Sequence, residues 1–166
     1  MTALLVVLTG LPYSGKTTLA RALERNGATV VELDHINRER GFRIEDGVPM
    51  AEWPETIRQA EARIEESSAD VVVLSWVNPS ERDRRRWRDF ASARGMRHQV
   101  VYLAADQELL DTRRSVAVAA PDRHMLSDEV LQRVQRRFQP PAEDSALVVE
   151  AGWSTQKQLE VVTAAL

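Results

Sequence analysis

The sequence predicts one α/β domain in which helices cover both faces of a parallel five-stranded sheet. Five short apolar runs, rich in valine and leucine, recur along the chain without the alternation of a half-exposed strand, which is the pattern of strands buried on both faces. Longer amphipathic segments separate these runs, as helical crossovers between parallel strands require. The 166 residues are enough for one complete core, so we expect a single domain over residues 1–166.

Each apolar run is an expected strand, and each amphipathic segment is an expected helix. The strands are Ala3–Leu8, Val30–Leu33, Val71–Leu74, Val100–Leu103 and Leu147–Val149. The helices are Lys16–Arg25, Glu52–Glu66, Ser80–Arg94, Leu109–Arg114, Asp128–Phe138 and Thr155–Leu166, with Gly27 and Gly95 placed to end the first and third. Before the third helix, Asn78 can cap the N-terminus, Pro79 is tolerated in the first turn, and Glu81 can complete a capping box.

Two connections are longer than this alternation of strands and helices requires. Residues 35–51 contain Gly41, Gly47 and Pro49, and residues 115–127 join two helices through Pro121. Long connections in compact domains are usually binding loops or lids. We therefore expect an acceptor loop at about residues 35–51 and a mobile helical lid at about residues 113–127.

The composition excludes several classes of protein. The chain has no cysteine, which excludes disulfides, thiolate metal sites and a cysteine nucleophile, and which fits the cytoplasmic location that we expect. A net charge of −3 argues against broad electrostatic capture of nucleic acid or anionic membranes. The first apolar run is too short to span a bilayer, so no membrane association is expected. The three histidines lack the spacing of zinc ligands.

One motif predicts nucleotide chemistry. Residues 10–17, Gly-Leu-Pro-Tyr-Ser-Gly-Lys-Thr, match the Walker A pattern, and they lie between a predicted buried strand and a predicted helix. A glycine-rich backbone at a helix N-terminus can wrap a phosphate with its N–H groups, while Lys16 reaches the terminal phosphates and the Thr17 hydroxyl binds Mg²⁺. We therefore expect ATP and Mg²⁺ as cofactors, with contacts from Gly10, Tyr13, Ser14, Gly15, Lys16, Thr17 and Thr18.

Three further segments carry a family resemblance. They are residues 31–38 (VELDHINR), residues 76–87 (WVNPSERDRRRW) and residues 121–131 (PDRHMLSDEVL), which run on to FQPP at 138–141. With the P-loop, they resemble the P-loop kinases that include polynucleotide kinase domains and many small predicted kinases, with zeta toxins and small-metabolite kinases as wider relatives. The resemblance implies a three-layer P-loop NTPase fold with strand order 2-3-1-4-5, an acceptor-site acid at Asp34, and a lid in the third segment.

A kinase needs a group that orients the attacking hydroxyl and takes its proton, and it needs cations over the transferred phosphate. Asp34 is our candidate base, because it directly follows the second strand. If that strand lies beside the P-loop strand, the Asp34 carboxylate faces the γ-phosphate. Two alternatives remain open: Asp34 caps a turn, or it forms an ion pair with Arg38. Glu32 is expected to point elsewhere, because side chains alternate along a strand. The other expected catalytic residues are Lys16, Arg38 and Arg123, and Arg113 and Arg114 are expected to contact the nucleotide.

The sequence departs from the family pattern at two places. Family members often carry an aspartate near the end of the third strand, where this chain has Leu74-Ser75-Trp76. We therefore expect Mg²⁺ to be held mainly by Thr17, Ser75 and the phosphates. Polynucleotide kinases place an arginine three residues after the acceptor-site acid, and that position is Asn37 here, with Arg38 one residue later.

These observations favour a kinase that phosphorylates a hydroxyl group of a small molecule, such as a metabolite, nucleoside, sugar or antibiotic. The arginines at 82–88 are interleaved with acids, which favours a solvated helix over a nucleic-acid surface. Trp76 and Trp153 follow predicted strands and can line the acceptor or adenine pocket. One alternative is a polynucleotide 5′-hydroxyl kinase, and another is a regulatory ATPase switch without a phosphoryl acceptor.

Overall fold

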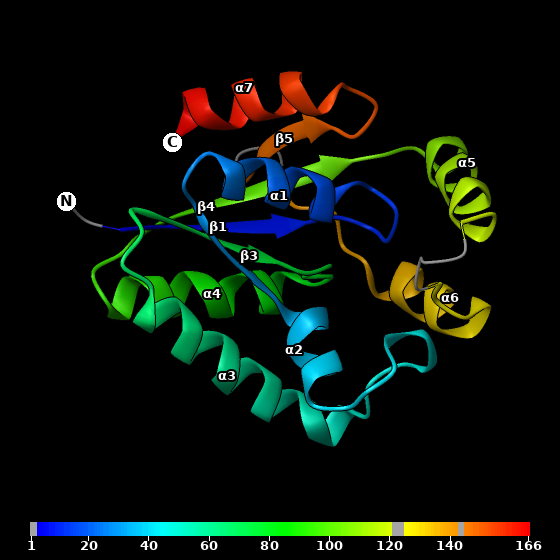
Figure 1. Ribbon diagram of the computed structural model, residues 1–166, viewed down its shortest axis with the longest axis horizontal. Coiled ribbons are helices and arrows are strands. Elements are labelled where there is room, and N and C mark those ends of the chain that lie inside the picture. Colours follow the sequence, from blue (N-terminus) through cyan, green and yellow to red (C-terminus); the bar gives the residue numbers. More distant parts are fainter. Residues whose placement is uncertain (1–2, 121–124, 143–144) are drawn as a thin grey trace.

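The computed structural model describes residues 3–120, 125–142 and 145–166. Its strands form one parallel sheet in the order β2-β3-β1-β4-β5 (Figure 1). The strands are β1 Leu4–Thr9, β2 Thr29–Glu32, β3 Val71–Ser75, β4 Arg97–Ala104 and β5 Leu147–Glu150. The predicted fold class, parallel sheet and strand order are therefore confirmed. Because β3 lies between β2 and β1, the expected direct contact of the second strand with the P-loop strand is wrong.

Helices cover both faces of the sheet (Figure 1). On one face lie α1 (Lys16–Arg25) and α7 (Thr155–Ala165), and on the other lie α3 (Trp53–Glu66) and α4 (Glu81–Ala93). Two more helices, α5 (Gln107–Val118) and α6 (Asp128–Arg137), lie beyond the carboxyl ends of the strands. As predicted, Gly27 and Gly95 follow α1 and α4 in a left-handed conformation.

The core consists of two hydrophobic clusters, one on each face of the sheet. Successive residues of β1 alternate between them: Leu5 and Val7 belong to the cluster with Trp87 of α4, whereas Leu4, Val6 and Leu8 belong to the cluster with residues of α1. Every residue of β1 is buried. This two-sided burial explains why the strand has no polar residue at alternate positions.

A short helix that the sequence analysis did not predict begins directly after β2. This helix, α2, spans Leu33–Glu39, where we expected the end of a strand and the start of a loop. Leu33 and Ile36 are fully buried, and their spacing of three residues places both on one face of a helix. The rest of the expected acceptor loop contains the 3₁₀ turns Ile44–Asp46 and Met50–Glu52. The candidate base Asp34 therefore lies in the first turn of a helix.

The start of α4 also differs from the prediction. Ser80 is the N-cap, and it forms a capping box with Asp83: the Asp83 N–H donates to Ser80 Oγ at 3.2 Å, and the Ser80 N–H donates to Asp83 Oδ2 at 3.1 Å. Asn78 instead adopts a left-handed conformation and donates from Nδ2 to the Leu8 carbonyl at 2.7 Å. Asn78 thus ties the loop after β3 to the end of β1, which gives it a partner that local sequence does not reveal.

Helix α5 is longer than expected at both ends. It begins after the N-cap Asp106 and continues to Val118, so residues 115–118 of the expected lid are helical. Residues 121–124 of that segment lie outside the described residues.

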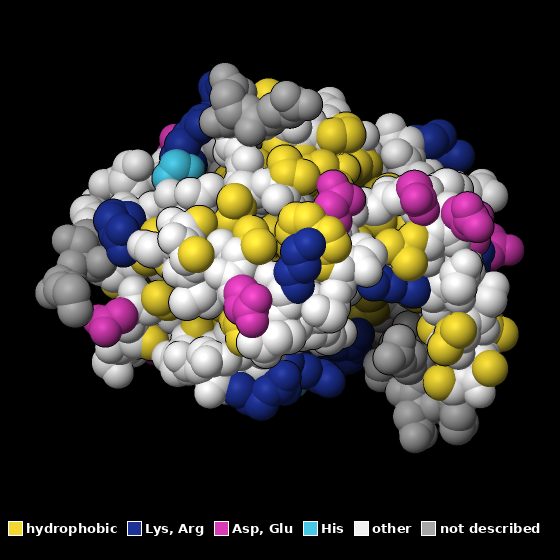
Figure 2. Space-filling view, turned by 90° about the horizontal axis from the view of Figure 1, so that it is seen from above, with side chains coloured by type: hydrophobic (Ala, Val, Ile, Leu, Met, Phe, Trp, Pro, Cys, Tyr) yellow, Lys and Arg dark blue, Asp and Glu magenta, His cyan; other side chains and the backbone are white. Residues whose placement is uncertain are grey.

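Across the described ranges, no helix combines the length and apolarity needed to cross a bilayer. Figure 2 shows the face that α1 and α7 cover, where acidic and basic side chains both occur among apolar and uncharged ones.

Candidate active site

Residues 10–15 connect β1 to α1 through a loop with unusual backbone angles. Gly15 precedes α1 at φ 97°, and Tyr13 also has a positive φ of 69°. A Cβ atom at Gly10 would lie 2.8 Å from Ser14 Oγ and 3.0 Å from the Leu103 carbonyl oxygen. Glycine is thus required at residue 10 by close approach. Consecutive backbone N–H groups at the start of a helix form an anion-binding site.

Lys16 bonds to the backbone of its own loop. Its Nζ donates to the carbonyl oxygens of Gly10 and Leu11, each at 2.8 Å, and to Ser14 Oγ at 3.4 Å. Burial lowers the pKa of Lys16 to about 8, and the negative charge of Asp34 opposes that shift. The ammonium group is therefore poorly solvated, and a phosphate would offer it a stronger partner than two carbonyls.

The two arginines expected at the nucleotide differ in their contacts. Arg113 of α5 donates from Nη1 to the carbonyl oxygens of Tyr13 at 3.2 Å and Ser14 at 2.9 Å, and from Nη2 to the Ala151 carbonyl oxygen at 2.5 Å. It thus holds the outer side of the P-loop and the turn after β5. Arg114 forms an ion pair with the exposed Asp128 of α6. The predicted catalytic Arg123 lies outside the described residues.

Asp34 and Lys16 interact electrostatically. Burial raises the pKa of Asp34, while the positive charges of Arg38 and Lys16 oppose the shift and the negative charge of Glu32 adds to it. The pKa of the Asp34 carboxyl group is thus raised although two cations act against the shift. A carboxylate with a raised pKa is a suitable proton acceptor.

Glu32, the last residue of β2, also acts on this group. Helix α2 begins at the next residue, and the negative charge of Glu32 raises the pKa of Asp34. Among the described residues, the buried Glu32 Oε1 has no hydrogen-bond partner. The sequence analysis gave Glu32 no role in the site; the signal that could have assigned one is its place as a second acid two positions before the candidate base.

The residues around the P-loop fit a magnesium ion. Thr17 is exposed in the first turn of α1, and Ser75, at the end of β3, stands in register with Glu32 on β2. The unpartnered Glu32 oxygen could accept from a water bound to the metal, which supplies the acid that β3 lacks. Within the described ranges, no three His, Cys, Asp or Glu side chains form a metal-binding group. Sparse protein ligation is typical of Mg²⁺, which keeps several waters and phosphate ligands.

Helix α2 is fixed to α3 by a buried polar network. Thr56 Oγ1 donates to Asn37 Oδ1 at 2.5 Å, and Arg40 Nη1 donates to Thr56 Oγ1 at 2.7 Å and to the Glu52 carbonyl at 2.8 Å. Asn37 is fully buried, so this position supplies a helix contact instead of an acceptor clamp. Arg38, the next residue, is exposed on the same helix as Asp34.

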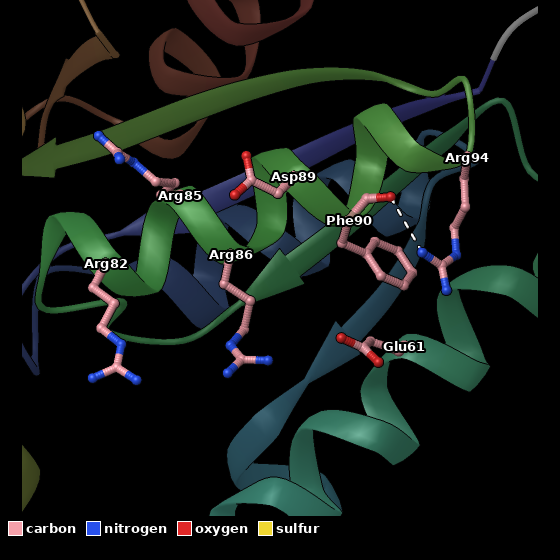
Figure 3. A pocket seen from close by; sticks show the side chains of 7 residues that line it. All are labelled: Glu61, Arg82, Arg85, Arg86, Asp89, Phe90 and Arg94. Atoms are coloured by element: carbon pink, nitrogen blue, oxygen red, sulfur yellow. Dashed lines mark hydrogen bonds between the residues drawn. The ribbon is translucent and has the colours of Figure 1, made fainter.

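A basic groove of about 430 Å³ lies on the outer side of α4, next to α3 (Figure 3). Its lining residues are Glu61, Arg82, Arg85, Arg86, Asp89, Phe90 and Arg94, and none belongs to the P-loop. Arg84 departs from the predicted solvated helix, because it is buried and donates to the Asn78 carbonyl at 3.0 Å. In the portion of the chain that the structure describes, Arg82, Arg85 and Arg86 have neither a hydrogen bond nor an ion pair.

Comparison with known proteins supports this reading of the fold. A family model described as AAA domain matches residues 5–141. Similar solved structures include a gluconokinase from Sinorhizobium meliloti 1021 (17% identity, TM-score 0.68, covering 98% of this chain and 90% of that one). The APS kinase CysC of Mycobacterium tuberculosis, in complex with AMPPNP and APS, is 20% identical with a TM-score of 0.71, covering 98% and 96%. Kti12 of Chaetomium thermophilum, in complex with ADP-AlF3, is 17% identical with a TM-score of 0.72, covering 97% and 98%. No curated protein matches the chain significantly.

Proposed function

Since this chain belongs to the AAA domain family, we propose that it is an ATP-dependent kinase whose acceptor is a hydroxyl group of a small molecule. The observation that carries the proposal is a half-buried acid, Asp34, in the first turn of α2, that interacts electrostatically with the P-loop lysine, Lys16. The gluconokinase and the APS kinase are named for small-molecule substrates, which supports the same class of acceptor here.

In this proposal each residue has a distinct task. The P-loop N–H groups and the N-terminus of α1 bind the phosphates of ATP, and Lys16 leaves its two carbonyl partners for the transferred phosphoryl group. Thr17 would hold Mg²⁺, which would neutralise phosphate charge. Asp34 orients the acceptor hydroxyl and takes its proton as the new O–P bond forms and ADP leaves. Because its pKa is raised, the Asp34 carboxylate is a stronger base than an exposed aspartate.

A transfer assay tests this function. Purified protein with Mg²⁺ and γ-labelled ATP is incubated with nucleosides, sugars, antibiotics, small metabolites and 5′-hydroxyl oligonucleotides, in parallel with Asp34→Asn. We expect the label to appear in one small-molecule class, at a rate at least about 10²-fold lower in the variant. Release of phosphate at a rate that no acceptor changes would instead identify a regulatory ATPase.

A polynucleotide 5′-hydroxyl kinase is the second candidate. The unpaired Arg82, Arg85 and Arg86 favour it, because exposed arginines with no protein partner can bind phosphodiesters. In the same assay, transfer to the oligonucleotide that falls steeply with added salt, and that falls further in an Arg82→Gln, Arg86→Gln double variant, would support this candidate. Salt-insensitive transfer to a small molecule would exclude it.

A further inference from the structure

Two tryptophans from distant parts of the sequence meet at the carboxyl edge of the sheet. Trp53 is the first residue of α3, and Trp76 follows the last residue of β3. Their ring centroids lie 4.7 Å apart at an interplanar angle of 44°. Both side chains are partly exposed, and both pack against the core cluster on the α3 and α4 face. The pair thus combines a rigid backing with an accessible aromatic surface.

Strand register places this pair beside the candidate base. Glu32 of β2 is in register with Ser75 of β3, so Trp76 and Leu33, the residue before Asp34, each directly follow this last pair of residues. Neighbouring strands lie about 4.8 Å apart. The backbone at Trp76 therefore leaves the sheet roughly one strand spacing from the backbone that leads into the helix turn with the acid.

Helix α3 cannot move freely relative to that turn. The hydrogen bond from Thr56 to Asn37 and those from Arg40 to Thr56 and Glu52 join α2 to the first turn of α3. Trp53 is therefore held at a fixed position relative to Asp34. An aromatic surface that is fixed beside a proton acceptor can hold a substrate in one orientation relative to that acceptor.

We propose that Trp53 and Trp76 form the wall against which the phosphoryl acceptor stacks, and that the acceptor is therefore a ring-shaped hydroxyl compound, not an open-chain polyol. This inference rests on the proposed kinase function. An indole face contacts a flat, weakly polar surface well, such as an aromatic base or the C–H face of a cyclic sugar. An open-chain polyol offers no such face, and it needs instead several polar partners.

Tryptophan fluorescence can test the wall without phosphoryl transfer. With AMPPNP and Mg²⁺ filling the nucleotide site, the protein is titrated with methyl β-D-glucopyranoside as a saturated ring, uridine as an aromatic one, and D-glucitol as an open chain. We expect at least one ring probe to change the emission saturably and D-glucitol to have no effect. Trp76→Leu should weaken binding of that probe about 5- to 10-fold or more, while Trp76→Phe, which keeps a ring, should retain most of it.

Trp153→Leu is the matched control. The sequence suggested a pocket role for Trp153 as well as for Trp76, but the structure places the two on opposite faces of the sheet: Trp153 lies beneath Lys157 of α7 and packs on the other cluster. Trp153 is also partly exposed, but it cannot share a wall with Trp76. It should leave probe affinity unchanged. Thermal unfolding of each variant separates lost binding from lost folding. Equal binding of D-glucitol, equal losses in Trp76→Leu and Trp153→Leu, or no saturable change with either ring would overturn the wall. ATP turnover that Lys16→Ala abolishes would still uphold the kinase, so the two hypotheses fail separately.

Discussion

Replacement of Arg113 by glutamine tests whether the P-loop is held in shape from outside. The wild-type guanidinium donates three hydrogen bonds to carbonyl oxygens, at 3.2, 2.9 and 2.5 Å, in two separate loops. Hydrogen bonds from charged groups contribute about 1.5–3 kcal/mol each. Because glutamine can reach fewer of these carbonyls and water can solvate the others, we expect a net loss of about 2 kcal/mol. For a chain of this size that loss lowers the Tm by about 4–8 °C.

The assay combines thermal unfolding of the ligand-free protein with calorimetric titration by ADP and Mg²⁺. If Arg113 positions the P-loop, both the Tm and the affinity should fall, the affinity by about 10- to 30-fold. If it contacts only phosphate, the ligand-free Tm should stay constant. Arg114→Gln, which removes an exposed ion pair with Asp128, is the control and should cost at most about 1 kcal/mol. An Arg113 variant as stable as this control would refute the reasoning.

Three further outcomes are expected. Asp34→Asn should leave ATP affinity near normal while phosphoryl transfer falls about 10²-fold. Because burial raises the pKa of Asp34, the folded wild-type protein holds this proton at pH values where the unfolded chain has lost it, and its stability falls as the pH rises above the ordinary aspartate pKa. The Asp34→Asn variant should therefore have a higher Tm than the wild type at pH 7 but not at pH 3. Lys16→Ala and Thr17→Ala should weaken Mg²⁺-ATP use in kinetic assays with circular dichroism unchanged. In denaturant unfolding, Gly10→Ala should destabilise the protein by about 1–3 kcal/mol, because its Cβ would lie 2.8 Å from Ser14 Oγ. The control Gly152→Ala, whose Cβ would have its nearest contact at 3.9 Å, should have a free energy of unfolding within about 0.5 kcal/mol of the wild type.

The sheet and the P-loop could be predicted because their signals are local. Continuous apolar runs report burial on both faces, and the glycines and lysine of the motif fix the loop between β1 and α1. Helix α2 was missed for a physical reason: it has seven residues, and no side chain caps it. Its first residue, Leu33, is as apolar as a strand residue, so the sequence gives no sign that β2 ends and α2 begins at this position.

The other misses depend on contacts between distant segments. Asn78 is a good helix cap by residue type, but Leu8 of β1 and Trp87 of α4 offer its side chain better partners. The contact of Arg113 with the Tyr13 and Ser14 carbonyls also joins distant segments, and the sequence gives no sign of it. Pairing of Trp53 with Trp76 depends on the packing of α3 and the end of β3 against one core cluster, which no local pattern encodes.

The lowered pKa of Lys16 has a consequence for chemical labelling. The chain contains only two lysines, Lys16 and Lys157. At pH 8, roughly half of the Lys16 amines would be neutral and nucleophilic, given its pKa of about 8, against roughly one in a few hundred for an ordinary lysine. An amine-directed reagent small enough to enter the P-loop would therefore modify Lys16 ahead of Lys157, and bound nucleotide would shield it. Mass spectrometry of that single adduct would report site occupancy directly, with no acceptor needed.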